Sequence, residues 1–127
     1  MGFKITKIDQ ANSEYNSEGG TFKFVLDGIP DQKWRNKFSD SVNGYSGRYF
    51  SKAPVIAVDT NIVEAYAKIH GDRDLEFVSS LLVSIIDSVN EEYDEEIKKI
   101  ADEEMKKRAA RAALEIEVTN QISKIKF

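Results

Sequence analysis

The chain has 127 residues, of which 41% are hydrophobic and 31% charged, and its formal net charge is −4. This length and balance exclude a disordered chain and are typical of one soluble globular domain. The absence of cysteine excludes disulfides, thiolate catalysis and cysteine-ligated zinc, and it favours a cytoplasmic location. The acidic balance argues against a general nucleic-acid binder. The longest apolar stretch, LLVSIID, is too short to span a membrane.

Two segments predict a first pair of antiparallel strands. The segments FKITKI (3–8) and TFKFVLD (21–27) are rich in β-branched and aromatic residues, and the second alternates between apolar and polar side chains. The polar stretch between them ends in two glycines, which indicates a long hairpin loop.

The next segment, GIPDQKWRNKFSDSVNG, predicts a short helix. Trp34, Phe38 and Val42 are spaced four residues apart and form one apolar stripe. A proline and an aspartate suit the first turn of this helix, and an asparagine–glycine pair closes it.

A second hairpin is expected in the middle of the chain. PVIAVD (54–59) is typical of a buried strand. IVEAYAKI (62–69) fits both a strand and one face of a helix. We expect a strand that turns at residues 59–61 and pairs with the first, because paired strands leave fewer open edges.

The remainder of the chain, residues 72–127, contains no glycine or proline and predicts helix. Apolar residues recur there every three or four positions, at Leu75, Val78, Leu82, Ile86, Val89, Tyr93, Ile97 and Ile100, and again at Leu114, Val118, Ile122 and Ile125. One unbroken helix of this length would extend roughly 80 Å, which is too long for a compact domain. The helix therefore either breaks, near Asn90 or around residues 108–113, or packs against another protomer.

The predicted fold is α+β, with a four-stranded antiparallel sheet in the order β-β-α-β-β followed by a helical arm of one or two helices. Residues 1–127 are expected to form a single domain, with the sheet and short helix in residues 1–70 and the arm in residues 72–127. One protomer offers no clear place to bury both apolar stripes of the arm. A homodimer or a larger closed assembly is therefore expected.

The only histidine, His70, lies in KIHGDRDLEF beside several acidic residues. No nucleophile elbow, zinc-binding or phosphate-loop pattern accompanies it, so we expect no enzyme, no metal site and no cofactor. The stretch instead predicts a turn at Gly71 and a helix cap at Asp72 or Asp74.

The candidate ligand-binding residues lie in two parts of the chain. Tyr45, Arg48 and Tyr49 combine a fixed positive charge with flat aromatic surfaces, which suits an anionic aromatic ligand. A loop whose tyrosines fold back onto the core explains the same residues. Arg108 and Arg111, in a basic stretch of the arm, are further candidates. The acid-before-base pairs at four-residue spacing in the same stretch are also typical of a solvated helix face.

The last candidate ligand-binding residue, Asn90, interrupts an apolar helical row. It would hydrogen-bond a ligand, specify the helix register in an oligomer, or mark a helix break.

The order of FKITKI, TFKFVLD, QKWRNKF, PVIAVD with IVEAYAKI, and the long helical tail resembles that of phage anti-defence sponge proteins. Sponges of the anti-Thoeris type sequester cyclic ADP-ribose-like signals in an oligomer. The resemblance covers most of the chain as element order, and it transfers no binding residues. It implies ligand capture without turnover.

Two function classes follow. The first is a non-enzymatic oligomeric protein that captures or sequesters a small anionic, nucleotide-like signalling ligand. The alternative is an adaptor or inhibitor that binds another protein through its helical arm and acidic surface.

Overall fold

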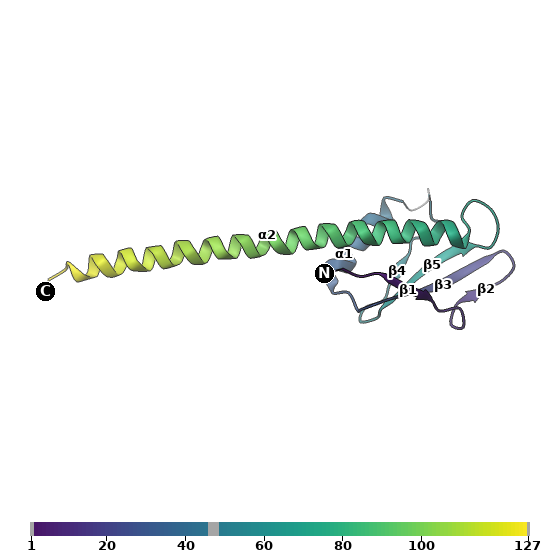
Figure 1. The fold of residues 1–127 in the computed structure, drawn as a ribbon, viewed down its shortest axis with the longest axis horizontal. Coiled ribbons are helices and arrows are strands. Elements are labelled where there is room, and N and C mark those ends of the chain that lie inside the picture. Colours follow the sequence, from purple (N-terminus) through teal and green to yellow (C-terminus); the bar gives the residue numbers. More distant parts are fainter. Residues whose placement is uncertain (1, 46–48, 127) are drawn as a thin grey trace. The chain divides into compact units, whose positions relative to one another are not determined.

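The computed structural model describes residues 2–45 and 49–126, and the chain forms two compact units, Met1–Asp94 and Glu95–Phe127. The elements are β1 (Ile5–Ile8), β2 (Glu14–Tyr15), β3 (Gly19–Leu26), α1 (Gln32–Asn43), β4 (Val55–Ile56), β5 (Ile62–Lys68) and α2 (Leu75–Ser123), as Figure 1 shows. All five strands lie in the first unit, together with α1 and the first part of α2. The remainder of α2 belongs to the second unit. The predicted α+β class is confirmed.

The sheet is antiparallel, with the strand order β1-β3-β5-β4 and with β2 also paired to β3. Both predicted strand pairings are present. Residues 62–68 form a strand and not a helix, as expected. The sheet has five strands where four were predicted, because β2 lies within the stretch expected to be a loop.

The sequence did not predict β2, because this strand is two residues long and is defined only by its pairing with β3. Gly20 stands opposite Tyr15 in that pairing. A side chain at Gly20 would collide with the β2 backbone at Glu14 and Tyr15. A glycine inside a strand often marks such a close approach of a second backbone. The two glycines therefore begin β3 and do not end a loop.

One face of the sheet carries the core of the first unit. In β3 and β5 every second residue is buried, and Phe24 stands opposite Val63 in the register. The buried residues form one cluster with the stripes of both helices, so α1 and the first part of α2 cover this face (Figure 1). The cluster contains Phe22, Phe24, Leu26, Trp34, Phe38, Val42, Phe50, Val63, Ala65, Ala67, Val78, Leu82, Ile85, Ile86 and Val89.

The strand predicted at 54–59 is present as β4, but it is shorter than predicted and is not buried. β4 contains only two residues and lies at the edge of the sheet, where Val55 is 53% exposed. The chain then turns at Asp59, which has a φ of 60°, and the Thr60 amide donates to the Ala57 carbonyl. The apolar residues of this segment therefore form a short edge strand and the turn that follows it.

The predicted short helix is confirmed as α1. Asp31 is its N-cap, and the Asp31 carboxylate accepts a hydrogen bond from the Trp34 amide at 2.9 Å. The predicted stripe of Trp34, Phe38 and Val42 is buried. α1 ends at Asn43, as the sequence indicated.

α2 runs from Leu75 to Ser123 without interruption, so neither predicted break, near Asn90 or around residues 108–113, occurs. The turn before it contains Gly71 with a φ of 98°, a conformation that side chains disfavour. The Asp74 carboxylate accepts a hydrogen bond from the Phe77 amide at 2.9 Å. Of the two candidate caps, the structure therefore identifies Asp74.

Replacing Asp74 with alanine is expected to lower the free energy of unfolding by about 0.5–2 kcal/mol, because the first turn of α2 loses its cap. Thermal or denaturant unfolding measures the difference. Asp72→Ala and His70→Ala are the matched controls, since both side chains are exposed in the same turn. An equal loss of stability in Asp72→Ala would contradict the assignment of the cap.

Candidate protein-interaction surface

Three aromatic side chains meet at the surface of the first unit. The ring centroids of Tyr45 and Tyr49 lie 5.6 Å apart, and those of Tyr49 and Phe77 lie 6.4 Å apart. All three residues are exposed, with fractions of 36–41%. Of the predicted ligand-binding residues, the structure therefore brings Tyr45 and Tyr49 together. We refer to Tyr45, Tyr49 and Phe77 as the aromatic cluster.

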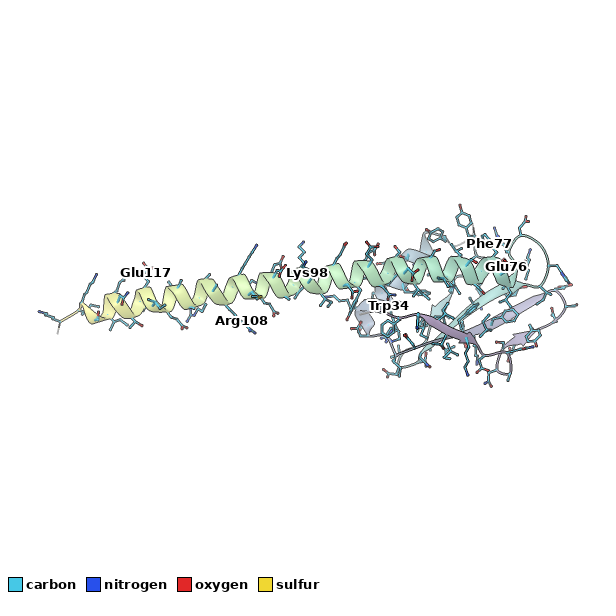
Figure 2. All side chains as sticks on the ribbon, in the orientation of Figure 1. Trp34, Glu76, Phe77, Lys98, Arg108 and Glu117 are labelled. Atoms are coloured by element: carbon cyan, nitrogen blue, oxygen red, sulfur yellow. The ribbon has the colours of Figure 1, made fainter. Side chains whose placement is uncertain are left out.

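Phe77 was not among the predicted site residues, and its side chain is labelled in Figure 2. Its exposure could have been predicted from spacing, because the buried helical row passes through Leu75, Val78 and Leu82 and leaves Phe77 off that face. The predicted Arg48 lies outside the described residues.

Asn90 ties three parts of the first unit together. Its Oδ1 accepts hydrogen bonds from the Phe3 amide and from Trp34 Nε1, both at 2.9 Å. Its Nδ2 donates to the Phe3 carbonyl at 2.7 Å. The Phe3 ring also meets the Trp34 ring edge-on, with the centroids 5.2 Å apart. These bonds give Asn90 a structural role, joining α2 to α1 and to the segment that precedes β1.

A second polar tie joins the same two helices. The Tyr93 hydroxyl donates to Asp31 Oδ2 at 2.6 Å. This hydrogen bond and the one from the Trp34 amide lower the pKa of the Asp31 carboxyl from its ordinary value. The same bond to Asp31 raises the pKa of Tyr93, because it favours the protonated hydroxyl. Asp31 therefore caps α1 with one carboxylate oxygen and holds α2 through Tyr93 with the other.

The predicted residues Arg108 and Arg111 belong to the second unit, and both are exposed. Arg111 Nε lies 3.2 Å from Glu115 Oε1, one turn further along the same helix. Figure 2 shows the side chains of Lys98, Arg108 and Glu117 projecting from this part of α2. Within the second unit, these groups make a solvated helix surface.

The second unit also carries a row of positions that alternate in steps of three and four residues. Ile97, Ile100, Leu114, Val118 and Ile125 provide its apolar members. Charged or polar residues occupy the positions between them, namely Glu104, Lys107, Arg111 and Gln121. This spacing is the a and d pattern of a helix that packs against another helix. We refer to these nine positions as the C-terminal face.

The C-terminal face is exposed along its whole length. Its apolar members have exposed fractions between 37% for Ile100 and 54% for Ile125. In the first part of α2, by contrast, the buried stripe includes Val78, Leu82 and Val89, which are at most 1% exposed. Apolar residues that recur at a and d spacing on an exposed helix are typical of a surface that packs against another helix. The C-terminal face is therefore the main candidate for an interaction surface.

The first unit contains a cavity of about 350 Å³ between the β1–β3 region and the start of α2. Its described lining consists of Ile8, Gln10, Tyr15, Phe22, Ile69 and Leu75. Gln10 Nε2 donates to the Tyr15 hydroxyl at its edge. None of these lining residues is charged, so the cavity does not match the anionic ligand that the sequence suggested.

Among residues 2–45 and 49–126, no group of three or more histidine, aspartate or glutamate side chains is arranged to hold a metal ion. In the same described ranges, no helix is both long enough and apolar enough to cross a membrane.

No family model, no curated protein and no solved structure matches this chain.

Replacing Asn90 with alanine is expected to lower the free energy of unfolding by about 1–3 kcal/mol, because the Phe3 backbone and the Trp34 indole lose their partner. Denaturant unfolding followed by Trp34 fluorescence measures the change. Ser88→Ala is the control, since Ser88 lies on the same helix with an exposed side chain. Equal stability of both variants would contradict the structural role of Asn90.

Proposed function

We propose that this chain is a non-enzymatic protein-interaction module that assembles through the C-terminal face. The observation that carries the proposal is the heptad spacing of the exposed apolar residues of the C-terminal face, in a unit whose described side chains are almost all exposed. Ile97 and Ile100 lie at one end of this face and Leu114, Val118 and Ile125 at the other. The absence of cysteine supports a cytoplasmic setting for this activity.

The energetics of a single helix support this proposal. Burying one leucine, isoleucine or valine side chain contributes about 1.5–3 kcal/mol, and the C-terminal face leaves five such side chains in water. Most helical stability in proteins comes from packing of an apolar face. An ion pair one turn apart on a helix surface, such as Arg111–Glu115, contributes only about 0.2–0.5 kcal/mol. Association would therefore add more stability than the charges on the helix do.

A second candidate function is the capture of a small anionic, nucleotide-like ligand, as the resemblance in element order to sponge proteins implies. The aromatic cluster favours it, because exposed tyrosine and phenylalanine rings offer stacking surfaces to a base. In this candidate the assembly and the ligand site would be separate features of the chain.

Replacing Val118 with glutamate is expected to weaken self-association of the full chain, because it places a carboxylate in the apolar row. Sedimentation or light scattering over a range of protein concentrations measures the effect. Ile116→Glu is the matched control, since residues two apart on a helix point to opposite sides and Ile116 lies off the C-terminal face.

The proposal expects Ile116→Glu to associate like the unmodified chain. A chain that is monomeric at every concentration would contradict assembly. Equal disruption by the two variants would contradict the choice of face.

For the second candidate, we expect a cyclic nucleotide or ADP-ribose derivative to raise the melting temperature, in line with mass action, and to be recovered intact after denaturation. Tyr49→Ala should abolish this shift, whereas Tyr15→Ala, an exposed tyrosine outside the aromatic cluster, should keep it. If no member of such a panel shifts the melting temperature, ligand capture is contradicted and the adaptor class remains.

A further inference from the structure

The order of charges along the C-terminal face restricts how two copies of this helix can pair. Its nine positions fall in one heptad pattern, with Ile97, Glu104, Arg111, Val118 and Ile125 at the a positions and Ile100, Lys107, Leu114 and Gln121 at the d positions. The three charged positions, Glu104, Lys107 and Arg111, follow one another in the middle of the row. Any partner helix must accommodate these three charges.

A parallel pair in register is disfavoured by this middle section. In a parallel dimer each a or d residue meets the same residue of the other copy. Glu104 would face a second Glu104, Lys107 a second Lys107, and Arg111 a second Arg111. Three successive layers would then bring like charges together in the seam, where water is largely excluded and repulsion is strongest.

An antiparallel pair resolves this conflict in one register. We propose that two copies of the chain pair antiparallel through the C-terminal face, with Arg111 packed beside the partner's Leu114 and Ile100 beside the partner's Ile125. This inference rests on the proposed function and adds the partner, the direction and the register. Lys107 then packs its methylene stem on the partner's Val118, and Glu104 meets the amide of the partner's Gln121.

The positions that flank the seam also match in this register. In antiparallel pairs, e positions meet e positions and g positions meet g positions. Arg108 then lies beside the partner's Glu115, and Glu103 lies beside the partner's Lys124. Two-fold symmetry repeats each of these opposite-charge pairs, and such flanking pairs set the orientation of paired helices.

Shifting the antiparallel register by one heptad destroys this match. In one direction Lys107 meets the partner's Arg111, and Arg108 meets the partner's Arg108. In the other direction Glu115 meets the partner's Glu115, and Glu117 meets the partner's Glu117. Unfavourable juxtaposition of like charges is a common device for excluding wrong pairings.

The end of the helix is ordered far enough to take part. Beyond Ser123, the Lys124 amide donates to the Gln121 carbonyl and the Ile125 amide donates to the Ile122 carbonyl, both at 3.1 Å. Lys124 and Ile125 are therefore held at the end of the helix, where the proposed register needs them.

Single cysteines test the register directly, because the natural chain contains none. Ile100→Cys and Ile125→Cys are made separately in the full chain, with tags of different size, and are oxidised alone and as a mixture. The proposal expects little disulfide in either variant alone and an abundant disulfide between the two variants in the mixture. Val118→Cys replaces Ile125→Cys as the register control and should cross-link to Ile100→Cys far less. All three substituted side chains are exposed and belong to the second unit, so the fold of the first unit should be unaffected, and Trp34 fluorescence verifies this.

Strong cross-linking of Ile100→Cys to itself would overturn the antiparallel direction, and preferred cross-linking to Val118→Cys would overturn the register. In both cases an associating chain would still support the proposed function. A chain that neither associates nor cross-links would overturn the proposed function together with this inference.

Discussion

The structure depends on the burial of one apolar stripe of α2 against the sheet. Val78, Leu82 and Val89 pack with the alternating side chains of β3 and β5, and they are almost completely removed from water. This burial supplies the main stabilising free energy of a small domain. The same helix continues past Asp94 with apolar residues at similar spacing, but the sheet belongs to the first unit alone. The need to bury this second row underlies the proposed assembly.

Polar groups at one end of the first unit fix how that burial is achieved. Asn90 bonds both Phe3 and Trp34, and Tyr93 bonds Asp31, the residue that caps α1. Each bond connects elements far apart in the sequence, so together they hold α1 and the N-terminal segment in place on α2. Such satisfied polar networks favour a single arrangement of a core over its alternatives. Asn90, which the sequence suggested as a ligand contact, therefore has a structural role.

Periodicity predicted the parts of this fold that local pattern determines. The strand alternation of TFKFVLD, the Trp34–Phe38–Val42 stripe and the turn at Gly71 are visible in neighbouring letters. β2 has only two residues, paired with β3 across a tight turn, so it is too short to show an alternation. The edge position of β4 depends on the pairing of β5 with the distant β3, which no local pattern reveals. Of the two alternatives for the long helix, the break is excluded by the unbroken α2, because it was inferred only from the expected size of a domain. At the candidate surface, spacing predicted the apolar members of the C-terminal face but also included Ile122, which lies off this face. The approach of Phe77 to Tyr49 required the structure.

We propose that the second part of α2 is stabilised by association and the first part by the sheet. Amide hydrogen exchange measured at several protein concentrations separates the two. We expect the protection of residues 97–123 to rise with protein concentration, while that of residues 78–89 stays high and constant. Protection of residues 97–123 that does not change with concentration would contradict it.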